Sequence, residues 1–496
     1  MNNGIIRYIL GKILIIEGGL LILPFIVGLI YGEEERRAFL PAMLACLVIG
    51  FLFSFKKPED TVFYLKEGCV VTALSWILLS LFGALPFIIT GEIPSFTDAV
   101  FETASGFTTT GASILSDVEA LSHASLFWRS FTHWIGGMGI LVFMLAIIPL
   151  TGGGSNFNLM RAESPGPSVS KLAPKLKSTA QVLYRIYIVL TVIEFLLLII
   201  FKMPVFDAIT LTLGTAGTGG FGIKNSSVAD YSVACQWIIT IFMLLFGVNF
   251  NAYFFIFLRQ FRKAFSMEEV RVYILSVLAS IAAITICIFK SCNGLFDAIT
   301  KASFQVVSIV TTTGYSTVDF DLWPTFPKYV LVLLMFMGAC AGSTGGGIKV
   351  SRFCILIKTF LKETLSYIHP KSIKKIDFDK KPIDHDTLRA TNVYMVTFLI
   401  IFVVSGLLVS LDDQNLITTF TAVAATINNI GPGLSAVGPT CNFALFSPGV
   451  KWVLIFDMLA GRLELFPILI LFHPGVLKDV VLTFTHTHHK KVNHKL

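Results

Sequence analysis

The stretch SFTDAVFETASGFTTTGAS, residues 95–113, contains the pattern that decides the fold, because three later segments resemble it. These are PVFDAITLTLGTAGTGGFG (204–222), ITKASFQVVSIVTTTGYST (299–317) and TTFTAVAATINNIGPGLS (418–435). Each places a small residue twelve positions before a shared glycine; the pairs are Ala99 and Gly111, Ala208 and Gly220, Ala302 and Gly314, and Thr419 and Gly431. Equal spacing in four copies indicates an internal repeat rather than chance similarity between apolar segments.

Long apolar runs flank these segments, and the whole chain has the composition of a membrane protein. Hydrophobic residues make up 54% of it and charged residues only 14%, far from the averages of soluble domains. A run of about 20 apolar residues can cross the hydrocarbon core as a helix. The sequence predicts ten passages, at 9–30, 39–55, 68–90, 125–150, 180–201, 232–258, 272–289, 329–361 (interrupted), 390–411 and 450–472.

We therefore predict an all-α polytopic membrane protein with four helix–pore-loop–helix repeats around a pseudo-fourfold pore. Residues 1–66 provide two additional N-terminal transmembrane helices. The repeats are assigned to residues 67–150, 178–263, 271–363 and 385–473, and the third repeat includes an intramembrane loop. Residues 474–496 are expected to form a cytoplasmic tail.

Basic residues in alternate loops predict the orientation, since cytoplasmic loops carry an excess of Lys and Arg. Residues 67–124 contain neither, so this stretch is expected to face outward. The net charge of +7 is then explained by loop placement, and no nucleic-acid partner is expected. The predicted cytoplasmic groups are Lys56, Lys57 and Lys66; Arg161, Lys171, Lys175 and Lys177; Arg259, Arg262, Lys263 and Arg271; the long basic loop 349–381; and the tail 486–495. Both termini come out cytoplasmic.

The glycine segments predict a cation site made of backbone. Irregular backbone survives in the hydrocarbon region only when it is buried in protein or lines a wet cavity. About ten residues before each glycine suit a short half-helix ending there, and its carbonyl end favours cations. Glycine also lets successive carbonyl oxygens turn toward an axis and replace the water of an ion. We expect the four shared glycines to ring one axis, with no transition metal and no organic cofactor.

The motifs resemble those of the Trk, Ktr and HKT superfamily of potassium transporters, and most closely its TrkH-type subunits. The resemblance covers nearly the whole chain and rests on TTTGAS (108–113), TGGFG (218–222), TTTGYS (311–316) and NNIGPGLS (428–435), together with WRSFTHWIGGMGILVF (128–143), AGSTGGGIK (341–349) and GRLELFPILILF (461–472). It implies channel-like potassium uptake across a bacterial plasma membrane. It also implies a potassium-binding filter made of Thr109, Thr110 and Gly111; Thr218, Gly219 and Gly220; Thr312, Thr313 and Gly314; and Asn429, Ile430 and Gly431.

Selectivity and partners are likewise implied by the resemblance. Glycine at all four positions accompanies potassium preference in this family, whereas serine in the first repeat accompanies sodium preference. The membrane subunit is expected to be a homodimer in membrane lipid. A cytosolic nucleotide-binding subunit of the TrkA type is expected to dock on the basic loop 349–381.

Residues 338–347 interrupt the eighth passage and include seven consecutive small residues. Small residues can also serve close helix packing. Each glycine, however, costs a helix about 1 kcal/mol, so three in succession favour an unwound, mobile loop. The resemblance implies that this loop lies below the filter and gates it, with Gly342, Ser343, Thr344, Gly345, Gly346 and Gly347 as gate residues.

Arg462 lies near the middle of the last passage, where a charged side chain is expensive and marks a functional site. Its neighbours at helical spacing are apolar, so it must face a cavity or another repeat. One reading is a structural cross-link to a carbonyl or an acid. The resemblance instead implies that Arg462 sits under the filter, repels cations and restrains the loop. Since a buried guanidinium needs acceptors and an unwound loop needs donors, we expect one shared gate.

Other patterns favour structural roles. Gly217, Gly219 and Gly222 satisfy GxGxxG without the strand and acidic residue of a dinucleotide site, and Ile348 replaces the lysine of a phosphate-binding loop. The intramembrane Glu17 and Glu194 are expected to hydrogen-bond between peripheral helices. His133 and Trp134 are expected to begin a helix as interfacial anchors. The eight cysteines are expected to be packing residues; they are Cys46, Cys69, Cys235, Cys287, Cys292, Cys340, Cys354 and Cys441.

Three alternative functions remain open from the residues. An integral membrane enzyme is disfavoured because the chain has no HExxH or comparable constellation. A secondary carrier for another solute usually shows two repeated halves rather than four short units. A less selective or sodium-coupled transporter of sodium and potassium has the same architecture, and proton coupling leaves no distinct pattern.

Overall fold

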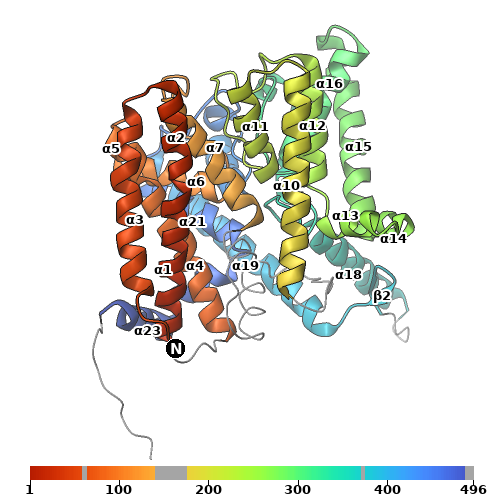
Figure 1. Cartoon of the computed structure of the whole chain (residues 1–496). Coiled ribbons are helices and arrows are strands. Elements are labelled where there is room, and N and C mark those ends of the chain that lie inside the picture. Colours follow the sequence, from red (N-terminus) through yellow and green to blue (C-terminus); the bar gives the residue numbers. More distant parts are fainter. Residues whose placement is uncertain (59–63, 140–175, 370–374, 486–496) are drawn as a thin grey trace, which may run out of the picture.

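The computed structural model describes residues 1–58, 64–139, 176–369 and 375–485. Figure 1 shows helices running roughly side by side, with shorter helices packed among them. The N-terminal pair and first repeat comprise α1 (Asn3–Leu20), α2 (Ile22–Tyr31), η1 (Glu35–Ala38), α3 (Phe39–Ser54), α4 (Leu65–Gly83), α5 (Leu85–Thr90), α6 (Phe96–Phe107) and α7 (His123–Met138). The second repeat comprises α10 (Leu176–Ile200), α11 (Val205–Gly217), α12 (Val233–Phe246), α13 (Phe250–Phe257) and α14 (Phe261–Ser266).

The second half of the chain has the same plan. The third repeat comprises α15 (Glu268–Ile288), η2 (Phe289–Ser291), α16 (Leu295–Val310), η3 (Phe320–Leu322), α17 (Thr325–Met337) and α18 (Val350–Ile368). The fourth comprises α19 (His385–Val409), η4 (Ser410–Asp412), α20 (Leu416–Ile427), η5 (Ser435–Val437), α21 (Pro448–Arg462) and α22 (Phe466–Leu471), followed by α23 (Pro474–Thr485). A small antiparallel hairpin of β1 (Asp377–Phe378) and β2 (Lys381–Pro382) precedes the fourth repeat. The prediction of a helical polytopic membrane protein is confirmed.

Six helices or helix pairs within the described residues are long and apolar enough to cross a membrane. They include 3–31, 35–54, 65–90, 181–200, 268–291 and 385–412, which match six of the ten predicted passages. The predicted passage 329–361 is interrupted as expected, since α17 ends at Met337 and α18 begins at Val350. The predicted passage 450–472 also breaks, between α21 and α22.

The predicted passage 232–258 is sharply bent. α12 and α13 meet at an angle of 91°. The turn contains Gly247 and Asn249, and the Asn249 side chain accepts the backbone N–H of Asn251 at 2.9 Å at the start of α13. The apolar run continues through the bend, so hydrophobicity alone does not reveal it.

The prediction that residues 349–381 form one long loop is wrong, because α18 occupies most of these residues. The expected tail likewise begins with α23. Several predicted features lie outside what the structure describes: residues 140–150 of the fourth passage, Arg161, Lys171, Lys175, the side chain of Lys177 and the tail 486–495. The N-terminus and α23 lie at the same end of the molecule (Figure 1), where Lys66 of α4 pairs with Asp479 at 3.1 Å.

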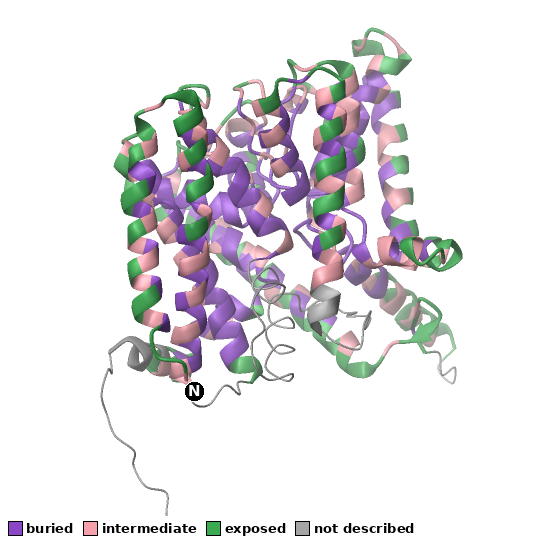
Figure 2. Cartoon of the chain, viewed as in Figure 1, coloured by how far each residue is buried: buried purple, intermediate pink, exposed green. Residues whose placement is uncertain are grey.

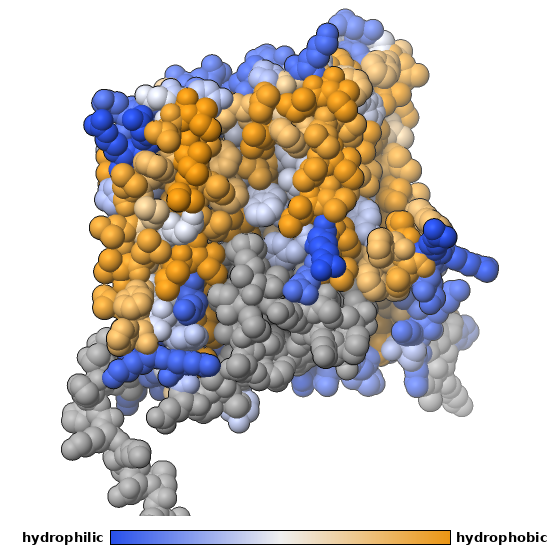
Figure 3. All heavy atoms as spheres, viewed as in Figure 1, coloured by the Kyte–Doolittle hydropathy of each residue, from blue (hydrophilic) through white to orange (hydrophobic). Residues whose placement is uncertain are grey.

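Burial and hydropathy agree with a membrane-embedded bundle. Central helices are buried and the outer faces of α1, α3 and α10 alternate between exposed and half-buried residues (Figure 2). Apolar side chains cover much of the visible side of the molecule, and hydrophilic ones gather toward its ends (Figure 3). Because lipid tails are as apolar as leucine, van der Waals packing rather than hydrophobicity holds such helices together.

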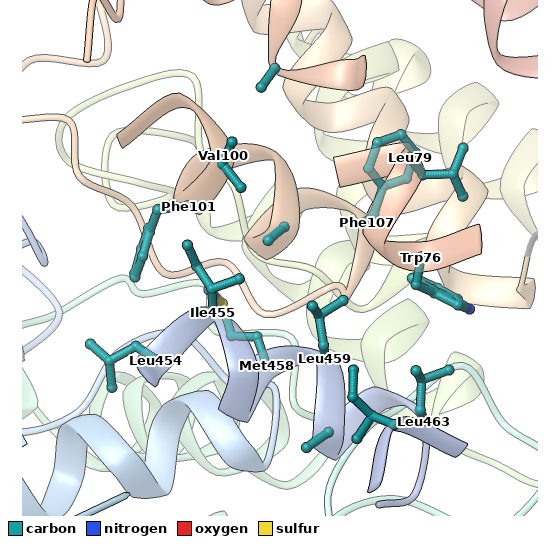
Figure 4. Close-up of a cluster of buried hydrophobic side chains, with 14 of the residues drawn as sticks. Trp76, Leu79, Val100, Phe101, Phe107, Leu454, Ile455, Met458, Leu459 and Leu463 are labelled. Atoms are coloured by element: carbon teal, nitrogen blue, oxygen red, sulfur yellow. The ribbon is translucent and has the colours of Figure 1, made fainter. Parts of the chain in front are cut away.

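One buried cluster joins the first and fourth repeats beside the pore helices. Figure 4 shows side chains of α4, α6, α21 and the residue after α21 meeting there: Trp76, Leu79, Val100, Phe101, Phe107, Leu454, Ile455, Met458, Leu459 and Leu463. The cluster thus contacts α6, which carries the first glycine segment, and α21, which carries Arg462.

The N-terminal pair packs through glycines. A methyl group on Gly11 of α1 would lie 2.6 Å from the carbonyl oxygen of Gly50 in α3, whereas one on Gly19 of α1 would meet nothing within 4 Å. The backbones of α1 and α3 therefore approach as closely as glycine allows.

We predict that Gly11→Ala lowers the stability of the folded protein in detergent by about 1–3 kcal/mol, the usual cost of overpacking a tight contact. Gly19→Ala is the matched control on the same helix and should leave stability unchanged or slightly higher, because alanine favours helix. Thermal unfolding followed by size-exclusion fluorescence measures both. Equal midpoints for the two variants would contradict the close contact of α1 with α3.

Candidate functional site

The four short pore helices α6, α11, α16 and α20 end in the same way. Each helix stops three or four residues before its shared glycine, earlier than the sequence predicts. The residue two positions before that glycine has a left-handed backbone in all four repeats, with φ of 55° at Thr109, 54° at Thr218, 58° at Thr312 and 56° at Asn429. Left-handed conformation costs a non-glycine residue about 1–2 kcal/mol, so four copies of it indicate a backbone geometry held by its surroundings.

A repeated hydrogen bond supports this geometry. The next backbone N–H after each left-handed residue bonds back to the carbonyl five residues earlier, as Thr110 to Ser105, Gly219 to Gly214, Thr313 to Ser308 and Ile430 to Ala425, at 2.8–2.9 Å. This is the pattern of a helix end capped by a left-handed residue. The four extended segments that follow, which we call the filter strands, therefore leave their helices in equivalent directions.

The shared glycines lie next to one another in a closed ring. Their φ angles are 77°, 82°, 85° and 98°, in the region that favours glycine. A methyl group on any of them would strike a carbonyl oxygen of the next repeat: Gly111 would meet Gly219 at 2.1 Å, Gly220 would meet Thr313 at 1.9 Å, Gly314 would meet Ile430 at 2.1 Å, and Gly431 would meet Thr110 at 2.7 Å. The contacts run from repeat 1 to 2, 3, 4 and back to 1, which is consistent with the expected fourfold arrangement.

The repeats are not identical outside this ring. α16 has 16 residues, whereas α6, α11 and α20 have 12, 13 and 12. The third pore helix is therefore about one turn longer at its N-terminal end. The equal spacing found in the sequence describes the C-terminal ends of the helices, where the filter strands begin.

The unwound segment 338–349, which we call the intramembrane loop, lies directly against filter strands 3 and 4. The backbone N–H of Gly346 donates to Oγ1 of Thr312 at 2.6 Å. A methyl group on Gly346 would lie 2.8 Å from the carbonyl oxygen of Asn428, and one on Gly345 would lie 3.0 Å from that of Thr311. The glycines thus allow the loop to contact the ends of two pore helices.

Buried polar side chains hold the loop. Oε1 of Glu269 accepts the backbone N–H of Ala341, near the start of the loop, at 2.6 Å and that of Ser351, just after its end, at 3.2 Å. The Lys349 amino group donates to the carbonyls of Gly345 and Gly346. Glu269 and Lys349 are 2% and 8% exposed. The intramembrane loop is therefore tied at its two ends and within itself.

The first basic residues of the predicted docking surface are not on a surface. Lys349 binds the loop, and Arg352, which is 5% exposed, forms an ion pair with Glu464 between α21 and α22. Lys349 and Arg352, at the start of the expected docking loop 349–381, are thus buried. Lys349 donates to buried backbone carbonyls, and Arg352 pairs with a buried carboxylate.

Arg462, the last residue of α21, donates to four oxygens of the described part of the chain. Its Nη1 bonds to the carbonyl of Thr344 in the loop at 2.8 Å and to Oγ1 of Thr109 in filter strand 1 at 3.2 Å. Its Nη2 bonds to the carbonyls of Gly136 and Gly137, near the C-terminal end of α7, the end that favours positive charge. The expected hydrogen bond between this guanidinium and the loop is present, and the side chain faces other repeats as expected.

The predicted role of His133 and Trp134 as anchors at the start of a helix is wrong. α7 begins at His123, so His133 and Trp134 do not start it, and His133 is fully buried. Glu194 is fully buried on the outer helix α10, where it lies beside Thr215 of α11. Glu17 is buried as expected, but within the described residues its carboxylate makes no interhelical hydrogen bond. Five of the eight cysteines are buried, consistent with packing, while Cys287 and Cys441 are exposed and Cys292 is intermediate.

A buried ion pair behind filter strand 1 was missed by sequence reasoning. Arg129 of α7 and Glu102 of α6 pair at 2.7 Å and are 2% and 1% exposed. Glu102 also accepts the backbone N–H of Ile114 at 3.0 Å. The only signal in the sequence was an acid inside an apolar repeated segment, with a basic residue in the following passage.

Comparison with known proteins identifies the family. The model of the TrkH family, described as a cation transport protein, matches residues 35–476. The chain is 37% identical over 489 residues to the Trk system potassium uptake protein TrkH of Salmonella typhimurium, covering 97% of this chain and 100% of that protein. The protein of the same name from Escherichia coli strain K12 is 37% identical over 487 residues, with 97% and 100% coverage.

A solved structure is also similar. The crystal structure of the potassium transporter TrkH from Vibrio parahaemolyticus matches with a TM-score of 0.86 at 31% identity, over 96% of this chain and 100% of that one. Sequence, fold and family model agree with one another. The chain belongs to the TrkH family of cation transport proteins.

Proposed function

We propose that this chain takes up potassium across the bacterial plasma membrane through a channel-like pore whose filter is the ring of glycine strands. The observation that carries the proposal is the closed series of contacts in which each shared glycine touches a carbonyl of the next repeat. Backbone carbonyls arranged around an axis can replace the hydration shell of a monovalent cation. The relatives named potassium uptake proteins support potassium as the cargo.

The proposed filter residues are the twelve given by the sequence, three in each strand. Thr109, Thr218, Thr312 and Asn429 set the left-handed turn, and the shared glycines permit the close approach of neighbouring strands. A filter of four non-identical strands is also compatible with a less selective or sodium-coupled transporter. Measured selectivity therefore tests the proposal directly.

We further propose that Arg462 and the intramembrane loop form one gate. The Arg462 guanidinium bonds to the loop at Thr344 and to filter strand 1 at Thr109, so it bridges the two. A fixed positive charge at this place opposes cations, and the loop fills space against strands 3 and 4. Opening then requires these hydrogen bonds to break.

We also propose an orientation and partners for this chain. The N-terminus and α23 share one end of the molecule (Figure 1), as expected if both termini are cytoplasmic. α18 leaves the loop directly and exposes apolar side chains at Phe360, Leu361 and Tyr367. These side chains of α18 and the neighbouring hairpin β1–β2 offer contact surfaces for a second copy of the chain and for a nucleotide-binding subunit of the TrkA type. Because α18 follows the intramembrane loop directly, a partner that moves α18 could move the loop.

For the filter, we predict that Gly220→Ser lowers the potassium-to-sodium permeability ratio by about tenfold, the equivalent of about 1.4 kcal/mol of differential ion binding. The physical reason is the 1.9 Å approach of a new Cβ to the Thr313 carbonyl. The ratio is measured by rubidium and sodium flux in liposomes.

Gly91→Ser is the matched control for the filter. Gly91 has φ of 79°, close to the 82° of Gly220, but a methyl group on it would meet nothing within 4 Å. Backbone strain is thus common to both variants, whereas the contact with a carbonyl is not. Equal ratios in wild type, Gly220→Ser and the corresponding Gly111, Gly314 and Gly431 variants would refute the filter.

For the gate, we predict that Arg462→Ala and deletion of residues 345–347 each raise cation flux in liposomes by about tenfold or more, since each removes buried hydrogen bonds of the closed state. The double change should add little, because both act on one gate. Lys451→Ala on α21 is the control, as Lys451 pairs with Asp98 at 2.5 Å and does not contact the loop. Unchanged flux in well-folded single variants would favour a structural cross-link.

For the partner, we predict that the wild-type protein purifies as a dimer and binds a TrkA-type nucleotide-binding subunit of the same organism. The double variant Lys380→Glu, Lys381→Glu should weaken binding by about tenfold or more at low salt, because surface charges steer and hold such contacts. Lys290→Glu, at the opposite end of α15, is the control. Purely monomeric protein with no affinity for the subunit would contradict the proposal.

A further inference from the structure

Filter strand 2 differs from the other three at one position. Immediately before the shared glycine, strands 1, 3 and 4 carry Thr110, Thr313 and Ile430, whereas strand 2 carries Gly219. The ring of His133 occupies the space of the missing side chain: a methyl group on Gly219 would lie 2.1 Å from Cγ and 2.2 Å from Nδ1 of that ring. His133 comes from α7 of repeat 1, so the wall of strand 2 is completed by its neighbour.

Both nitrogens of this ring are used. Nδ1 lies 2.8 Å from the carbonyl oxygen of Gly106 in pore helix α6, and Nε2 accepts the backbone N–H of Phe221 at 3.2 Å. An imidazole that donates from Nδ1 and accepts at Nε2 is neutral. His133 therefore joins the pore helix of repeat 1 to the backbone of strand 2, one residue beyond the shared glycine.

Arg129, one helical turn before His133, fixes the next part of the same strand. Its Nη1 donates to the carbonyl of Gly222 at 3.1 Å, and its guanidinium lies 4.0 Å from the centre of the Phe221 ring. The His133 ring lies 4.3 Å from that ring. The outer half of strand 2 is thus held by two side chains of α7, while Tyr315, the equivalent of Phe221 in strand 3, donates its own hydroxyl to Leu211 at 3.1 Å.

The contact of His133 with Gly219 affects the ring of carbonyls around the shared glycines. The oxygen that a methyl group on Gly111 would strike belongs to Gly219, the residue packed on His133. Strand 2 has glycines at 219, 220 and 222, and α11 ends at a further glycine, Gly217. Glycine has the greatest conformational freedom. Without an external support, this strand is the one of the four that is least restrained at the position where its carbonyl meets the next strand.

We propose that His133 is a positioning residue for cation selectivity: its ring replaces a side chain at position 219, and its hydrogen bonds fix filter strand 2. The inference rests on the proposed filter function but assigns part of the selectivity to a residue outside the four filter strands. It also explains why strand 2 departs from its sister strands at that position.

The test compares His133→Leu with His133→Gln in liposomes. Leucine keeps most of the volume but leaves the Phe221 N–H without its acceptor and removes the His133 bond to the Gly106 carbonyl, which keeps only the Thr109 N–H at 3.1 Å. The potassium-to-sodium permeability ratio should therefore fall by about tenfold. Glutamine can both donate and accept and should restore most of the ratio. His123→Leu, at the start of the same helix, should retain the wild-type ratio. A wild-type ratio in folded His133→Leu would overturn the proposal.

Gly219→Ala provides a second test that leaves the histidine in place. Its new methyl group must displace the ring, so it should also lower the ratio, and an unchanged ratio would overturn the proposal even if His133→Leu does not fold. Failure of the filter function itself is distinguishable. In that case wild-type protein would show no selective potassium flux, whereas failure of this inference alone would leave wild type selective and the variants equally so.

Discussion

The need to satisfy every backbone polar group inside a bilayer governs this structure. Helices meet that need within themselves, but the four filter strands and the intramembrane loop cannot, and each unsatisfied group in hydrocarbon costs several kcal/mol. Side chains from neighbouring elements provide the partners: Thr312 binds the Gly346 N–H, Glu269 binds the N–H groups of Ala341 and Ser351, and Arg462 binds the Thr344 carbonyl. Irregular backbone is found where such partners converge.

The buried charges follow from the same need. Breaking a buried ion pair by removing one partner costs about 3–5 kcal/mol, so such pairs fix the elements that carry them. Glu102 and Arg129 join the exit of strand 1 to strand 2, and Arg352 and Glu464 join α18 to the break between α21 and α22. At that break Glu464 and Leu465 have φ of 53° and 71°. The strained turn therefore lies where an ion pair holds it.

The sequence predicted what depends on repetition and hydrophobicity, and missed what depends on contact between repeats. Spacing around Gly111, Gly220, Gly314 and Gly431 identified the pore segments because one backbone geometry requires glycine at one place. The bend between α12 and α13 was hidden within a continuous apolar run. The position of His133 was not predictable, because its partners Gly106 and Phe221 belong to a helix and a strand that only the folded chain brings near. The burial of Lys349 was not predictable either, because it depends on how the loop that carries Gly345 and Gly346 packs in the folded chain. A basic residue after an apolar run looks the same whether it faces solvent or buried carbonyls.

The four strands share one backbone geometry, but different side chains and loops contact each of them. This difference determines which groups meet around the intramembrane loop. The loop comes from repeat 3 and lies against strands 3 and 4, whereas Arg462 comes from repeat 4 and binds strand 1 and the end of α7. Repeat 2 contributes the carbonyls of Phe246 and Gly247, which accept the loop N–H groups of Thr344 and Cys340. All four repeats thus meet at one place through different atoms. A symmetric tetramer would place identical groups around the axis, while a single chain with diverged repeats can assign one arginine and one loop to the same position.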